Sequence, residues 1–118
     1  MTAIPRTLAE IYFDAWQAQD FDRLRSVLAE DVTFRGPLGT ADGVDACMQG
    51  LQGMAQMMTD VVVHARVVEG QDVITWFDLH TDLAQPCPTA NWSHVENGKI
   101  AAIRATFDAR EIAAALGR

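Results

Sequence analysis

The stretch HVENGKIA, residues 94–101, contains the strongest short-range turn signal in the chain, Asn97-Gly98. An Asn-Gly pair between two apolar-rich segments is typical of a two-residue type I′ hairpin, because both residues accept a positive φ. The segments on either side, 89–96 and 99–107, are rich in β-branched and aromatic residues. The sequence therefore predicts two antiparallel strands joined by a tight turn.

The register of this hairpin predicts which side chains face inward. Directly opposed residues share a face, so counting back from the turn pairs His94 with Ala101 and Trp92 with Ile103. That face also carries Phe107 and is the less polar of the two. We therefore expect Trp92 and His94 to face the interior, although a β-bulge would reverse part of this assignment.

Two further strands precede the hairpin. VVVHARVV, residues 61–68, and VITWFDLHTD, residues 73–82, are separated by the turn sequence EGQD. Both are rich in residues that favour extended structure. The loop LAQPCP, residues 83–88, then leads to the hairpin, and its two prolines interrupt regular structure. Together these segments predict a four-stranded antiparallel meander.

The first half of the chain predicts helices. TLAE, residues 7–10, is a capping box that opens a helix ending near Ala18. Asp20 is placed to cap a second, shorter helix, and Asp42 a third. In the third helix apolar residues recur with a period close to 3.6 over 44–58.

Short elements complete the order of the chain. VTFR, residues 32–35, predicts a strand between the second and third helices, and Asp108 begins a short C-terminal helix. Helices followed by a meander predict an α+β fold, with helices laid over one face of a curved sheet.

Composition limits the classes of function. The chain has 118 residues with a net charge of −7 and no basic run, so we expect no nucleic-acid partner. No apolar run approaches the length of a membrane span, and the N-terminus lacks a signal-peptide pattern. Cys47 and Cys87 form no C-x-x-C motif, and free thiols indicate a reducing compartment. We therefore expect a cytoplasmic protein that does not bind membranes.

The stretch WFDLHTD, residues 76–82, supplies the candidate chemistry. Strand alternation puts Trp76, Asp78 and His80 on one face. If that face is the inner one, these side chains form a cluster with Trp92 and His94. Two indoles, two imidazoles and a carboxylate would not make a dry core, so we expect them to line a pocket.

Within this cluster Asp78 and His80 are the candidate acid–base pair. An imidazole beside a carboxylate forms a general base tuned near neutral pH. The alternative is a structural pair, or two solvated residues on an open face. The pattern D-x-H-x-D is not a metal-binding motif, so we expect no metal ion and no cofactor.

Three segments carry a resemblance to a known family: YFDAWQAQDFDRLRSVLAEDVTF (12–34), GPLGTADGVDAC (36–47) and ENGKIAAIRATFD (96–108). The chain resembles the nuclear transport factor 2-like superfamily, which includes SnoaL-like polyketide cyclases, ketosteroid isomerase and limonene epoxide hydrolase. The resemblance extends from about residue 7 to residue 107. It implies one SnoaL-like domain over 1–118, with a curved antiparallel sheet wrapped around three helices into a cone that holds an internal pocket.

The resemblance also bears on single residues. Tyr12 stands eight residues before Asp20, which matches the oxyanion-hole tyrosine of ketosteroid isomerase. Gly36 occupies the place of that enzyme's aspartate base, so the carboxylate is missing. The second oxyanion donor corresponds to Trp92, or to Asn91 if the strand slips.

We predict a small-molecule-binding domain that acts as an isomerase, cyclase, dehydratase or hydrolase on an apolar organic substrate by general acid–base chemistry. The alternative is a non-catalytic ligand-binding or dimerisation module with the same fold. The expected catalytic residues are Asp78, His80 and Tyr12, and the expected substrate-binding residues are Trp76, Trp92, His94 and Phe107. We also predict a homodimer through the outer sheet face, on which Phe77 and Leu79 would lie.

Overall fold

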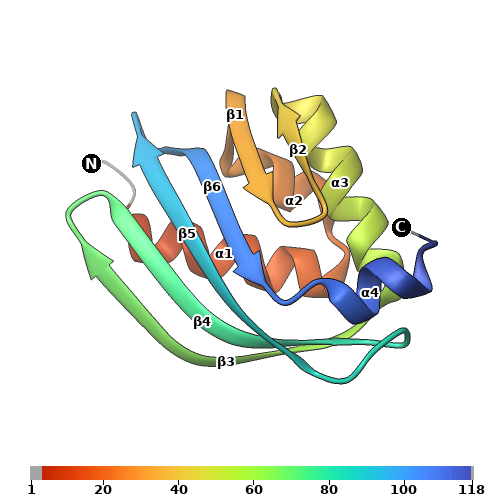
Figure 1. Ribbon diagram of the computed structural model, residues 1–118. Coiled ribbons are helices and arrows are strands. Elements are labelled where there is room, and N and C mark those ends of the chain that lie inside the picture. The colour runs from red at the N-terminus through yellow and green to blue at the C-terminus, as the bar shows by residue number, and fades with distance from the viewer. Residues whose placement is uncertain (1–3, 118) are drawn as a thin grey trace.

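A computed structural model describes residues 4–117 and shows a curved sheet with helices packed against it (Figure 1). The chain forms, in order, α1 (Pro5–Ala18), α2 (Phe21–Ser26), β1 (Leu28–Gly36), β2 (Gly39–Asp42), α3 (Val44–Met57), β3 (Met58–Glu69), β4 (Asp72–Thr81), β5 (Cys87–Glu96), β6 (Lys99–Phe107) and α4 (Arg110–Ala115). None of the helices in the described part of the chain is long and apolar enough to cross a membrane.

The six strands form one sheet in the order β2-β1-β6-β5-β4-β3. Strands β3 to β6 form the predicted antiparallel meander, while β1 runs parallel to β6 and pairs with β2 through a short hairpin. Helix α1 crosses behind β3, β4 and β5, and α3 packs against β1 and β2 (Figure 1). The α+β prediction is confirmed; strand β2, in the segment after GPLG, was not predicted.

Of the two aspartates predicted to cap helices, one does so. Asp20 caps α2 as expected, because its side chain accepts a hydrogen bond from the Arg23 backbone N–H. Asp42 does not cap α3: the N-cap residue is Gly43, and the Asp42 carboxylate instead accepts a hydrogen bond from Arg35 at 2.8 Å. The carboxylate is therefore held by a guanidinium on the neighbouring strand.

Helix α1 begins three residues earlier than its capping box predicts. Its first residue is Pro5, whose fixed φ suits the first helical position, so Thr7 lies inside the helix and caps nothing. The buried face of α1 supplies the aromatic part of the core, with the Phe13 ring packing edge-on against Phe77 at 5.1 Å. The Trp16 indole donates a hydrogen bond to the backbone oxygen of Leu51 and so ties α1 to α3.

The hairpin turn is the predicted one. Asn97 has a φ of 52° and Gly98 a φ of 75°, as a type I′ turn requires. Glu96 pairs with Lys99, and the next pair, Val95 with Ile100, also follows the expected register. The turn therefore fixes the start of the β5–β6 ladder.

One residue beyond the first two pairs, a β-bulge shifts this ladder. Val95 pairs with Ile100, but His94 pairs with Ala102, so Ala101 is an extra residue on β6. Trp92 consequently lies opposite Arg104 instead of the buried Ile103. The predicted pairs of His94 with Ala101 and Trp92 with Ile103 are wrong for this reason.

The bulge brings Ile103 of β6 to the face on which β5 and β4 bury their side chains. On β5 the buried side chains are Cys87, Thr89, Asn91, Ser93 and Val95. On β4, which pairs with β5 without a shift, they are Val73, Thr75, Phe77 and Leu79. The opposite faces of both strands point away from the helices, so the predicted inward cluster is reversed.

Candidate functional site

A cavity of about 470 Å³ opens between the helices and the inner sheet face. Its walls come from α1, α3, the β1–β2 hairpin and strands β4 to β6, with one residue from the end of α4. Most of its lining is apolar, including Trp16, Phe34, Leu38, Leu51, Met54, Met57, Phe77, Leu79, Phe107 and Leu116. A few polar groups in an apolar hollow of this size are typical of a small-molecule site.

The main polar feature of the cavity is the pair formed by Tyr12 of α1 and Asn91 of β5, and Asn91 is also bonded to Ser93, outside the lining. The Tyr12 hydroxyl hydrogen-bonds the side chain of Asn91, and the Ser93 hydroxyl donates to Oδ1 of Asn91 at 3.1 Å. The Asn91 hydrogen bond lowers the pKa of Tyr12, which is the effect of a donor to the hydroxyl oxygen, so the amide nitrogen of Asn91 donates to Tyr12. This leaves the phenolic O–H of Tyr12 able to donate to a bound molecule.

Tyr12 stays protonated over the whole physiological range. It is only 1% exposed, and this burial raises the pKa of its hydroxyl far above the usual value, an effect that the Asn91 hydrogen bond offsets only slightly. The neighbouring Cys47 is also protonated, because burial raises the pKa of its thiol to about 11. Both groups are therefore neutral donors, and Cys47 is a poor nucleophile at neutral pH.

The cavity carries no formal charge on its described lining. None of the lining residues within 4–117 is an aspartate, glutamate, histidine, lysine or arginine. An ionic ligand loses its hydration on entering such a cavity, and an uncharged apolar lining does not offset that free-energy cost. The site is therefore suited to a neutral molecule.

Asp78 and His80, the predicted catalytic pair, lie on the outer face of the sheet. The Asp78 carboxylate is 2.8 Å from Nε2 of His64, an extra residue at a second bulge in β3. His80 lies opposite Asp60 on the same outer face. The β4 backbone separates both side chains from the cavity, so the prediction that they line it is wrong.

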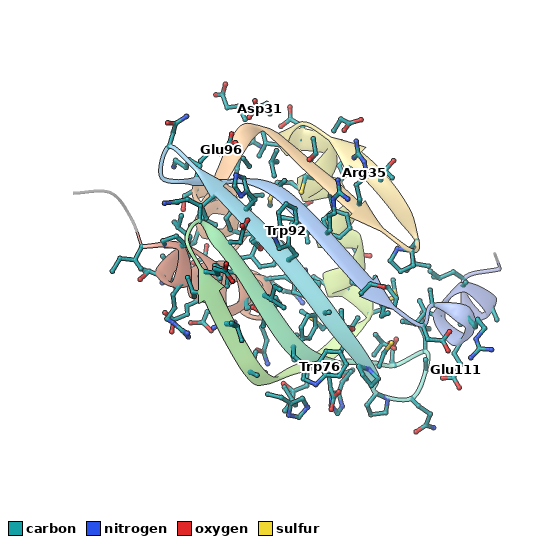
Figure 2. The ribbon with its side chains drawn as sticks, turned by 60° about the vertical axis from the view of Figure 1, so that its left-hand side comes forward. Asp31, Arg35, Trp76, Trp92, Glu96 and Glu111 are labelled. Atoms are coloured by element: carbon teal, nitrogen blue, oxygen red, sulfur yellow. The ribbon has the colours of Figure 1, made fainter. Side chains whose placement is uncertain are left out.

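Three of the predicted substrate-binding residues also lie outside. Trp76 is 46% exposed, and Figure 2 shows it with Trp92 on the sheet face turned away from the helices. Trp92 stacks on His94 with ring centroids 5.8 Å apart, and the Arg104 guanidinium lies 5.9 Å from the same indole. Tyr12 and Phe107 are the predicted site residues that the structure brings to the cavity.

Two features of the cavity were not predicted from the sequence. Asn91 was named only as the alternative to Trp92 for the second oxyanion donor. The small polar and apolar residues at alternate positions of β5 were the signal that its side chain faces inward. The second is Phe34: a Cβ added at Gly36 would lie 2.9 Å from its ring. A phenyl ring therefore fills the space beside the position where ketosteroid isomerase carries its base.

The sequence as a whole matches one family. The model of the SnoaL-like domain matches residues 9–103. The chain belongs to the SnoaL-like domain family. Among curated proteins no sequence matches this SnoaL-like chain.

Solved structures agree with this family in fold. An NTF2-like protein of unknown function from Cytophaga hutchinsonii is 26% identical, with a TM-score of 0.85 over 95% of this chain and 96% of its own. A steroid delta-isomerase from Pseudomonas aeruginosa is 16% identical (TM-score 0.80; 96% and 85% covered). An LEH-like epoxide hydrolase from M. tuberculosis is 21% identical (TM-score 0.75; 95% and 88% covered).

An ion pair on the outer sheet face should make the stability of the fold depend on pH. Nδ1 of His94 is 2.7 Å from Asp72 and Nε2 is 3.4 Å from Glu96, and the Asp72 hydrogen bond is the main cause of a raised His94 pKa. A raised folded-state pKa stabilises the fold below the ordinary value of about 6.5, and this stabilisation disappears as pH rises through the raised value. We expect Asp72→Asn to lower the His94 pKa, as measured by an NMR titration of the imidazole.

The control for this titration is Asp22→Asn, a change on α2 in a carboxylate that makes no contact with His94. It should leave the His94 titration in place. An unchanged His94 pKa in Asp72→Asn would show that the pair does not form in solution.

Proposed function

We propose that this SnoaL-like chain binds a small, neutral, largely apolar organic molecule with one oxygen acceptor at Tyr12. The observation that carries the proposal is the uncharged cavity of about 470 Å³ with a buried, neutral hydroxyl on its wall. We infer that residues 1–118 form one such domain. Its two free cysteines suit a reducing compartment, and we place it in the cytoplasm.

The apolar lining supplies the affinity in this proposal. Side chains from both the sheet and α3, such as Phe77, Leu79 and Met54, present carbon atoms to the hollow. Each square ångström of apolar ligand surface removed from water contributes about 25 cal/mol. Met54 and Met57 add side chains that can adapt to the outline of a ligand.

The polar groups supply the orientation. The Tyr12 O–H, held by Asn91, is placed to donate to a ligand oxygen such as a carbonyl. A hydroxyl held in place by a neighbouring amide loses little entropy when the ligand arrives. The ligand's oxygen would therefore point toward α1 and β5, with its apolar body toward α3 and the β1–β2 hairpin.

Binding is better supported than acid–base catalysis. A general base must lie within hydrogen-bond reach of the proton that it removes, directly or through one water. Asp78 and His80 are on the far side of the sheet, and the described cavity lining holds no carboxylate or imidazole. Isomerase and epoxide hydrolase activities are named for the structural neighbours; for this chain the geometry supports a ligand-binding module.

We also propose that two chains pair through the outer sheet face. Contrary to the prediction, Phe77 and Leu79 do not lie on this face, because both side chains line the cavity. Other apolar side chains support the same pairing: the exposed outer-face residues are Val62, Val67, Ile74 and Trp76, with exposed fractions of 38, 62, 47 and 46%. Exposed apolar side chains of this size on one sheet face are typical of an interaction surface.

The first prediction concerns the hydroxyl of Tyr12. The probe is prodan, a neutral fluorescent naphthalene that carries a ketone. We expect Tyr12→Phe to weaken prodan binding about 3- to 10-fold in a fluorescence titration, because it removes one hydrogen bond worth about 1 kcal/mol. The carbonyl-free analogue 2-dimethylaminonaphthalene should bind both proteins with nearly equal affinity.

His80→Ala is the matched control for the pocket. Its side chain lies on the outer face, so prodan affinity should not change. Loss of prodan binding in His80→Ala together with unchanged binding in Tyr12→Phe would contradict the proposal and restore the outer-face site.

The second prediction concerns the pairing of two chains. We expect the wild-type protein to sediment as a dimer at micromolar concentration and Trp76→Glu to sediment as a monomer with an unchanged circular dichroism spectrum. The control variant Gln56→Glu adds the same charge at an exposed position of α3, and it should stay dimeric. A wild-type monomer at that concentration would rule out the outer-face dimer.

A further inference from the structure

Helix α3 contains two glycines, Gly50 and Gly53, in its interior. Glycine lowers helix stability relative to alanine, because it loses more backbone freedom on folding. Two such residues in one 14-residue helix therefore need a reason.

The fold does not require glycine at either position. Gly43 and Gly98 have φ values of +89° and +75°, which favour glycine, but Gly50 and Gly53 have ordinary backbone angles. A Cβ added at Gly50 or at Gly53 would meet no heavy atom within 4 Å. A larger side chain would therefore fit the unliganded protein at both positions.

The open space beside these glycines adjoins the cavity. Gly50 and Gly53 are both exposed and both line it, together with Ala46, which lies one turn before Gly50. Spacings of three and four residues place the three on one face of α3. Leu38, which follows β1, and Leu116, at the end of α4, line the same cavity, so the small residues form one side of its mouth.

A buried group on the same helix also points to a ligand. The Cys47 thiol, 1% exposed, lines the cavity close to the Tyr12 hydroxyl. Its pKa of about 11 keeps it a neutral S–H at physiological pH. The wall of α3 thus combines open space at the surface with a neutral S–H donor deeper in, beside Tyr12.

We propose that Gly50 and Gly53 set the size of the molecule that the cavity admits. They leave room for a rigid ligand at least two fused rings wide to lie against the α3 backbone. A single-ring ligand reaches Tyr12 without using that space. This inference rests on the proposed binding function and specifies its ligand class.

The test compares two neutral ketones of different width, prodan and the single-ring acetophenone. Binding of both is followed by NMR through the side-chain amide signals of Asn91. We expect Gly50→Leu and Gly53→Leu to weaken prodan binding by at least about tenfold, a loss typical of a steric clash in a pocket. Acetophenone affinity should change by less than about twofold.

Two controls separate blocking from misfolding. Gln56→Leu adds the same side chain to an exposed position of α3 outside the cavity lining and should bind both ketones like the wild type. Gly50→Ala should raise the melting temperature by a few degrees, because alanine favours the helix and nothing obstructs its methyl group.

The outcomes distinguish the two proposals. If the wild type binds both ketones and the leucine variants do so equally well, the glycines do not set ligand size and the inference is overturned. If the wild type binds neither ketone, the proposed function fails and the inference with it. A leucine variant that changes only the sedimentation of the protein would show that the glycine face contacts another chain, which also overturns the inference.

Discussion

The extra residue Ala101 on β6 is the constraint on which the interior depends. Ile100 and Ile103 are three residues apart, so a regular strand would place them on opposite faces. The bulge lets both side chains enter the core, where each has no exposed surface. Because β5 pairs with β6 on one side and β4 on the other, the face that Ile100 and Ile103 share is also the face of Asn91 on β5 and of Phe77 and Leu79 on β4.

The facing of these strands determines which side chains each face of the sheet carries. The inner face receives the uncharged side chains, and Tyr12 of α1 meets Asn91 there in a hollow without formal charge. The outer face receives Asp78 and all 3 histidines of the chain, each beside a carboxylate or across from one. Charged groups thus stay in contact with water, and the cavity suits neutral ligands.

The fold could be predicted from the sequence because its signals are local. Asn97-Gly98 fixes a turn, Asp20 caps a helix, and the period of α3 is clear from its apolar residues alone. The facing of β4 and β5 could not be derived from the hairpin, because a bulge depends on how Ile100 and Ile103 pack against the helices. The simpler signal was the better one: the apolar side of WFDLHTD, with Phe77 and Leu79, faces the core.

The central claim is that the ligand lies on the Asn91 side of the sheet and not on the His80 side. Intermolecular nuclear Overhauser effects to bound prodan test it most directly, because they report protons within about 5 Å of the ligand. We predict cross-peaks from prodan to the Asn91 side-chain amide and the Phe77 ring, with none to the His80 ring or the Trp76 indole. Cross-peaks to His80 and Trp76 without any to Asn91 would contradict the account.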